Sequence, residues 1–265
     1  MRWRPSLRLG CQTAMPDWLR LSVGTFTRLP VPAPRRVDQA TAGWAMTFAP
    51  VIAFVLALIC ALPVLLAGNN LARALLLSAL SVGLLTWCTR ALHLDGLADT
   101  ADALGSGKPA AEALVIARKS DIGPFGVLAI AFTLALQVFA LSAAATTSLG
   151  AGRGYLMLII AVVTGRIALL WACTKPVPAA RPDGLGAVVA GTVPWFVTVG
   201  WTIALLLAAY FALNLVGLGM VIAGIIIGVI VIAIASRRLG GVTGDVLGGV
   251  IETSTTAALV IGALL

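Results

Sequence analysis

Seven long apolar runs limit what this chain of 265 residues can fold into. A helix needs about 20 mostly apolar residues to cross the hydrocarbon core of a bilayer. The runs cover residues 44–67, 74–92, 125–147, 155–173, 195–213, 215–235 and 246–265. Only 11% of the residues are charged, too few to cover a soluble globular surface. We therefore predict an all-α, polytopic membrane protein, a helical bundle with about seven transmembrane helices, that binds no nucleic acid.

The basic residues indicate how such a bundle is oriented. Of the 18 Lys and Arg residues, 15 fall in the N-terminal arm or in connections on its side of the membrane. Only Arg73 and Arg153 fall on the other side, and Arg166 lies within a span. Cytoplasmic loops carry an excess of Lys and Arg, so the N-terminus is predicted to be cytoplasmic. All ten acidic residues fall on or near that side, where we expect the chemistry.

The change from an Arg-rich to an apolar sequence divides the chain into two expected parts. Residues 1–43 form a basic N-terminal cytoplasmic arm, in which 15–43 is a candidate for the membrane interface. Residues 44–265 form a single transmembrane catalytic domain with its active site at the cytoplasmic face.

Three aspartates follow the second run at i, i+4 and i+7: Asp95, Asp99 and Asp102. On a helix they fall within an arc of roughly 60°. Clustered carboxylates suit Mg²⁺, which takes hard oxygen ligands together with substrate phosphates. A solvated polar helix end would also explain them, although such ends usually mix in Lys or Glu. His93, the only histidine, lies about 200° from Asp95 around the helix, which favours a structural role over a direct one.

A second candidate region is the glycine-rich stretch 237–252, with five glycines in sixteen residues. So many glycines are costly in a helix and predict a backbone that bends around a bulky or anionic ligand. Asp245 and Glu252 are seven residues apart and share a helix face. Glu252 and Arg166 are charges within spans, and such charges are functional candidates by default. Pairing with Glu252 and phosphate binding both remain open for Arg166.

One membrane face therefore collects aspartates, arginines and glycine-rich turns. This combination is typical of Mg²⁺-assisted phosphoryl transfer, in which cations neutralise the phosphates and arginines stabilise the developing charge.

Five segments carry a resemblance to a known family: Thr27–Pro32, His93–Asp102, Ile122–Val127, Ala180–Gly186 and Gly240–Gly248. In this order and spacing they resemble cobalamin synthase, the adenosylcobinamide-GDP ribazoletransferase family. The resemblance covers the chain from about Trp18 to its end.

The resemblance implies a late step of cobalamin (vitamin B12) biosynthesis. The cobinamide-phosphate group of adenosylcobinamide-GDP would pass to α-ribazole or its 5′-phosphate, giving adenosylcobalamin or its phosphate and GMP. It implies Mg²⁺ as cofactor, the inner (plasma) membrane of a prokaryote as location, and the lipid bilayer as a partner. A homo-oligomer and other enzymes of the cobalamin pathway are further candidate partners.

The resemblance also assigns roles to residues of this sequence. Asp95, Asp99 and Asp102 become catalytic metal ligands, and Asp245 a further catalytic acid. Arg181 and Arg238 become candidate phosphate contacts. Together with four residues named independently of the resemblance, they make up the expected substrate-binding residues: Arg166, Arg181, Arg238, Thr243, Glu252 and His93.

Two alternatives remain at this point. A CDP-alcohol phosphatidyltransferase-like enzyme also carries an aspartate stripe at a membrane helix, but the run Asp95–Asp99 lacks the arginine of that pattern. A membrane transporter is favoured by Arg166 and Glu252, whereas the one-sided acids argue against it. Nucleotide-dependent product formation would separate an enzyme from a transporter.

Overall fold

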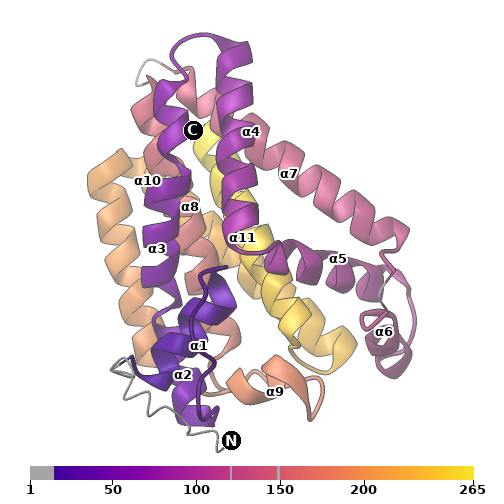
Figure 1. Ribbon diagram of the computed structural model, residues 1–265. Coiled ribbons are helices and arrows are strands. Elements are labelled where there is room, and N and C mark those ends of the chain that lie inside the picture. The colour runs from indigo at the N-terminus through magenta and orange to yellow at the C-terminus, as the bar shows by residue number, and fades with distance from the viewer. Residues whose placement is uncertain (1–14, 120, 148–149) are drawn as a thin grey trace, which may run out of the picture.

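The computed structural model describes residues 15–119, 121–147 and 150–265, and this part of the chain is helical without a β-strand. The helices are α1 (Asp17–Phe26), α2 (Gln39–Thr47), α3 (Ala49–Cys60), the 3₁₀ helix η1 (Leu62–Leu66), α4 (Leu71–Cys88), α5 (Leu92–Gly105), α6 (Ala110–Ile116), α7 (Pro124–Ala145), α8 (Gly150–Ala172), α9 (Gly184–Val189), α10 (Trp195–Leu239) and α11 (Gly244–Leu264). Figure 1 shows them as one bundle, with α5, α6 and α9 at the same end as the start of α11.

Six helical stretches among the described residues are long and apolar enough to cross a membrane: 39–66, α4, α7, α8, α10 and α11. The stretch α10 has 45 residues, more than twice the roughly 20 that one span requires. Its backbone leaves the helical region at Leu213 and Asn214, and Asn214 adopts a left-handed φ of 53°. Two spans therefore meet there, which confirms the prediction of about seven transmembrane helices and its break at residue 214.

Two predicted spans have different bounds in the structure. The run 44–67 is divided into α2, α3 and η1, because Pro50 and Pro63 lie in the first turns of the new helices, where proline needs no N–H partner. The run 74–92 was predicted as one helix, but α4 ends at Cys88. Arg90 and Ala91 have φ values of 58° and 55°, which an α-helix excludes. The aspartates consequently lie on a separate helix, α5, which runs across the direction of α4 (Figure 1).

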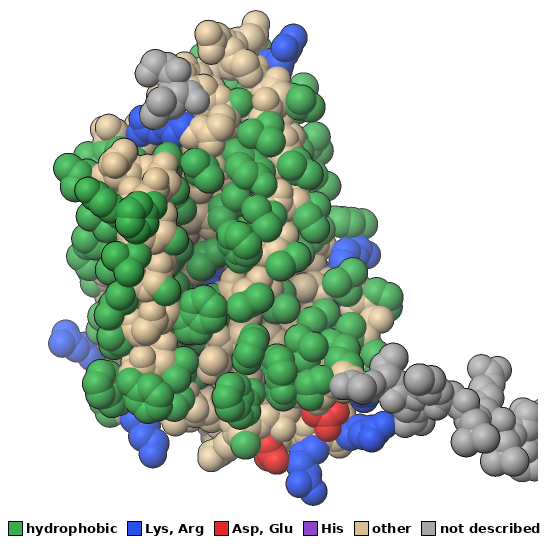
Figure 2. Space-filling view, turned by 90° about the vertical axis from the view of Figure 1, so that its left-hand side faces the viewer, with side chains coloured by type: hydrophobic (Ala, Val, Ile, Leu, Met, Phe, Trp, Pro, Cys, Tyr) green, Lys and Arg blue, Asp and Glu red, His purple; other side chains and the backbone are tan. Residues whose placement is uncertain are grey.

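The core is built around α8. All residues from Met157 to Leu170 are buried, and the helix packs against α3, α7, α10 and α11. The outward faces of the surrounding helices are also apolar, with Leu76, Phe211 and Leu215 at least 70% exposed. Figure 2 shows this apolar band on one face of the molecule, with acidic side chains only near its lower end. Large exposed apolar surfaces of this kind are expected where lipid replaces water as solvent.

The described part of the N-terminal arm is docked on the bundle. Phe26 is buried in the core, and the Ser22 hydroxyl donates a hydrogen bond to the Ala45 carbonyl over 2.9 Å. The helix α2 crosses the boundary predicted between residues 43 and 44. Residues 1–14 of the predicted arm lie outside the described residues, and the cytoplasmic orientation of the N-terminus stays a prediction.

Candidate active site

The close contact between α5 and the start of α11 brings the candidate acids together. A Cβ atom on Gly96 would lie 2.7 Å from the Asp245 carbonyl oxygen, and one on Gly248 would lie 2.9 Å from the His93 carbonyl oxygen. Only glycine permits backbones this close. Gly248 was predicted to help the chain bend around a ligand, but it lies inside α11 at this helix contact. Its role is to place Asp245 beside the aspartates of α5.

Asp99 is the carboxylate most affected by this arrangement. Partial burial raises its pKa from 3.8 to about 6, and the neighbouring charges of Asp245, Asp95 and Asp102 add to the rise. Arg181 acts in the opposite direction. Like charges that lie close together repel one another and disfavour ionisation. A cation bound beside these acids would reduce that repulsion.

Asp245 is held by two of the predicted substrate-binding residues. Its Oδ2 atom lies 3.3 Å from an Arg181 guanidinium nitrogen and accepts a hydrogen bond from the Thr243 hydroxyl over 3.2 Å. The Thr243 hydroxyl also accepts from the Val246 amide and so caps α11. The loop that carries Arg181 is fixed to residue 242 by two backbone hydrogen bonds, of 3.0 and 2.9 Å.

Asp102 has contacts that the sequence did not predict. It is buried, and its two carboxylate oxygens accept hydrogen bonds from the backbone amides of Gly123 and Gly126 over 2.7 and 2.9 Å. These amides belong to the N-terminus of α7, where a helix favours a negative charge. Asp102 therefore ties α5 to α7, whereas Asp95, Asp99 and Asp245 are the acids that solvent reaches. The predicted metal-binding role of Asp102 stays a prediction.

Three of the predicted substrate-binding residues form a separate polar network inside the bundle. A guanidinium nitrogen of Arg166 lies 3.2 Å from His93 Nδ1, and the same Nδ1 atom lies 3.9 Å from Glu252 Oε1. Gln137 donates to Glu252 Oε2 and to the Thr256 hydroxyl, each over 3.0 Å. Among the described residues no hydrogen bond joins this network to the exposed aspartates. His93 thus lies beside both Arg166 and Glu252, and its Nδ1 atom accepts the hydrogen bond from Arg166.

Gln137 was missed in the sequence, although it is the only side-chain amide in the run 125–147. An amide in an apolar span needs partners, and that need is the signal that could have identified it. Arg238 lies on the exposed last turn of α10, and no contact among the described residues connects it to the acids. The structure thus brings Arg181 and Thr243 to the acids and places Arg238 apart from their direct contacts.

A second ion pair, between Arg118 and Asp183, lies apart from Asp95, Asp99 and Asp245. Two guanidinium hydrogen bonds, each of 2.7 Å, join Arg118 to the two carboxylate oxygens of Asp183. The guanidinium lowers the pKa of Asp183. This exposed pair connects the end of α6 to the start of α9.

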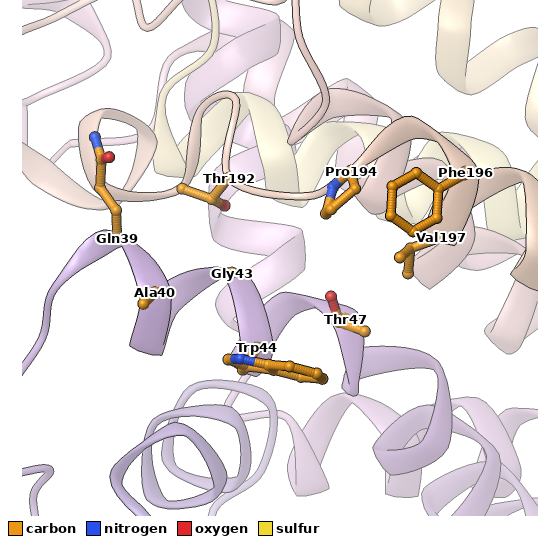
Figure 3. Close-up of a pocket in the computed structure, with 9 residues that line it drawn as sticks. All are labelled: Gln39, Ala40, Gly43, Trp44, Thr47, Thr192, Pro194, Phe196 and Val197. Carbon is orange, nitrogen blue, oxygen red and sulfur yellow. The ribbon is translucent and has the colours of Figure 1, made fainter.

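The hollow in Figure 3 lies elsewhere, between α2 and the segment that leads into α10. It measures about 330 Å³ and contains none of the predicted site residues. Gln39, Trp44 and Thr47 line one side, and Thr192, Pro194 and Phe196 line the other. The candidate active site is therefore the surface formed by Asp95, Asp99, Asp245 and Arg181.

The chain is similar to proteins of one family over almost its whole length. A family model described as cobalamin-5-phosphate synthase matches residues 18–263. The adenosylcobinamide-GDP ribazoletransferase of a Nocardioides species is 40% identical, with 92% of this chain and 97% of the relative covered. The protein of the same name from Frankia casuarinae is 38% identical, with 92% and 94% covered. No solved structure matches the chain significantly. The chain belongs to the cobalamin-5-phosphate synthase family of transferases.

Proposed function

We propose that this protein is an adenosylcobinamide-GDP ribazoletransferase. A ribose hydroxyl of α-ribazole or its 5′-phosphate attacks the phosphorus that bears cobinamide. The new P–O bond forms as the bond to GMP breaks, GMP leaves with the electron pair of that bond, and the proton of the hydroxyl passes to water. The observation that carries the proposal is the meeting of Asp95, Asp99 and Asp245 with Arg181 at one end of the bundle. Family membership favours this reaction over a CDP-alcohol transferase or a transporter.

The donor chemistry of this surface suits Mg²⁺. No three His, Cys, Asp or Glu side chains in the described part of the chain are close enough to form a complete ligand group. Mg²⁺ does not require one, because it usually takes one or two carboxylates together with waters and substrate phosphates. Asp99 on α5 and Asp245 on α11 are the carboxylates that would hold it, with the charge of Asp95 beside them. When bound, Mg²⁺ would neutralise the phosphates and activate the attacking hydroxyl.

In this proposal Arg181 binds the substrate in addition to contacting Asp245. One of its guanidinium nitrogens contacts Asp245, while its buried Nε has no hydrogen-bond partner among the described residues. The Arg181 side chain is partly exposed, and its guanidinium carries more N–H groups than the contact with Asp245 uses. We assign one of these groups to a phosphate oxygen of the substrate. Arg181 would then bridge the substrate and the carboxylate group.

The polar network around Arg166 stabilises the position of α5, the helix that carries Asp95 and Asp99. His93 is two residues from Asp95 on α5, and its contact with Arg166 fixes that helix against α8. In this proposal Arg166, His93 and Glu252 position α5 rather than bind substrate. The active site faces the cytoplasm of a prokaryotic cell from its plasma membrane, as the distribution of basic residues favours.

A product assay on protein reconstituted in liposomes tests the proposal. Adenosylcobinamide-GDP and Mg²⁺ are supplied with α-ribazole or with α-ribazole 5′-phosphate, and GMP and the cobalamin product are followed by chromatography. We expect both products in equal amounts, and their loss in Asp99→Asn and Asp245→Asn. The control is Glu112→Gln, since Glu112 is exposed and pairs only with Lys108 among the described residues. Absence of product from folded wild-type protein would refute the proposed reaction.

A further inference from the structure

A basic hollow lies where α4 ends, and none of the functions above uses it. It measures about 390 Å³ and is lined by Arg28, Gly83, Thr86, Trp87, Arg90 and Ala91. Arg28 belongs to the segment Thr27–Pro32, which the sequence singled out and the active site does not contain. Two arginines, a threonine and a tryptophan therefore line the same space.

The two arginines are held in place. The backbone amide of Arg28 donates to the Cys88 carbonyl over 2.8 Å, and its guanidinium carbon lies 3.9 Å from the centre of the Trp87 ring. The Arg90 side chain donates to the Gly24 carbonyl, and its backbone has the left-handed φ of 58°. Both side chains have thus lost conformational freedom before any ligand binds, which lowers the entropic cost of binding.

The positive charges of Arg28 and Arg90 also lack an acidic partner in the part of the chain that the structure describes. Among the described residues neither Arg28 nor Arg90 forms an ion pair, although both are exposed. Stacking on Trp87 engages the face of the Arg28 guanidinium and leaves its N–H groups in the ring plane free to donate. A phosphate group is the anion that suits two such donors.

The wall beside the hollow is apolar and faces outward. One face of α4 carries four residues at helical spacing: Leu76, Leu80, Gly83 and Trp87. The side chains of Leu76 and Trp87 are 70% and 64% exposed. A Cβ atom added to Gly83 would meet nothing within 4 Å, so the surface is open there. Because α4 is a membrane span, this stripe meets hydrocarbon chains, and Trp87 marks the level of the headgroups.

We propose that this hollow binds the phosphate headgroup of an anionic phospholipid, with an acyl chain along the outward stripe of α4. The stripe distinguishes a lipid from a soluble phosphate, since a soluble ligand would gain nothing from it. Basic residues near an anionic membrane surface each strengthen lipid binding by about fivefold. The proposal does not depend on the transfer reaction.

Tryptophan quenching by brominated lipids tests this site. The full chain is placed in phosphatidylcholine nanodiscs that contain a low fraction of phosphatidylglycerol. In one sample the phosphatidylglycerol carries bromine on its acyl chains, and in a second sample the same fraction of the phosphatidylcholine does. We expect brominated phosphatidylglycerol to quench more than brominated phosphatidylcholine at the same fraction, and Trp87→Phe to remove the excess. Arg28→Gln should weaken the phosphatidylglycerol dependence about fivefold, and the double variant with Arg90→Gln further. Arg73→Gln, at the opposite end of α4, should change nothing.

Three outcomes would overturn the proposal. Equal quenching by the two lipids in wild-type protein would show no headgroup selectivity. An excess that survives in Arg28→Gln and in the double variant would place the lipid elsewhere. Loss of the excess on adding inorganic phosphate or GMP at constant ionic strength would assign the hollow to a soluble phosphate. If Arg90→Gln fails to fold, Arg28→Gln alone still tests the site. Within the folded protein it removes only the stacking contact with Trp87 among the described residues, so it should fold.

Discussion

Replacement of Asp99 by asparagine should make the metal-free protein more stable above about pH 6. The folded chain holds the Asp99 charge, partly buried, beside Asp245 and Asp95. An acid whose pKa is raised by folding binds its proton more tightly in the folded state, so stability falls as pH rises from 3.8 to about 6. Asparagine has no proton to lose and gains no charge, so the variant escapes this fall in stability.

The rise in the pKa of Asp99 sets the size of the stability difference between Asp99→Asn and the wild type. A rise from 3.8 to about 6 corresponds to at most about 3 kcal/mol. Solvent screens a group that is this exposed, so we expect roughly 1 kcal/mol to remain. For a chain of this size that is about 2–4 °C in Tm. Below about pH 4 the carboxylic acid is neutral, and the difference should vanish.

Thermal unfolding in detergent with EDTA, followed by tryptophan fluorescence, measures this difference. Asp183→Asn is the matched control, because the Arg118 guanidinium lowers the pKa of Asp183 and its loss should not stabilise the protein. A melting temperature of Asp99→Asn that equals or falls below that of the wild type at high pH would refute the crowding of these acids.

Three further predictions concern the packing around the site. Asp102→Ala should lower the free energy of unfolding by about 1–3 kcal/mol because the backbone amides of Gly123 and Gly126 lose their acceptor, and Asp102→Asn should cost less, as melting curves would show. Gly96→Val should abolish both folding yield and transfer because its Cβ would strike the backbone of α11, whereas Gly152→Ala, with open space around it, should behave as wild type in size-exclusion chromatography. Gln137→Leu should cost about 2 kcal/mol by removing a donor to Glu252; an unchanged melting temperature would contradict the network.

Much of the fold could be predicted because apolar length is a direct consequence of bilayer thickness. Even the break at Asn214 follows from the span length, as no single helix of 45 residues fits the hydrocarbon core. The end of α4 could not be predicted in the same way. Residues 89–92 contain no proline or glycine that would signal the end of a helix, and only the left-handed backbone of Arg90 and Ala91 separates α4 from α5.

The acids of the site could be identified from their spacing, but their tasks could not. Asp99 and Asp102 look equivalent along the sequence. They differ because Asp102 meets the amides of Gly123 and Gly126, which come from a helix that begins about twenty residues later. The glycines of 237–252 were ambiguous for the same reason, since helix contacts and ligand contacts both require small residues.

Manganese binding tests the central claim, that the carboxylates of α5 and α11 hold the catalytic cation. Mn²⁺ replaces Mg²⁺ in the reconstituted protein, and electron paramagnetic resonance measures bound and free metal during a titration. The account predicts one class of bound Mn²⁺ that weakens at least tenfold in both Asp99→Asn and Asp245→Asn, about 1.4 kcal/mol or more, and is unchanged in Glu112→Gln. Equal Mn²⁺ affinity in the wild type and both aspartate variants would contradict it.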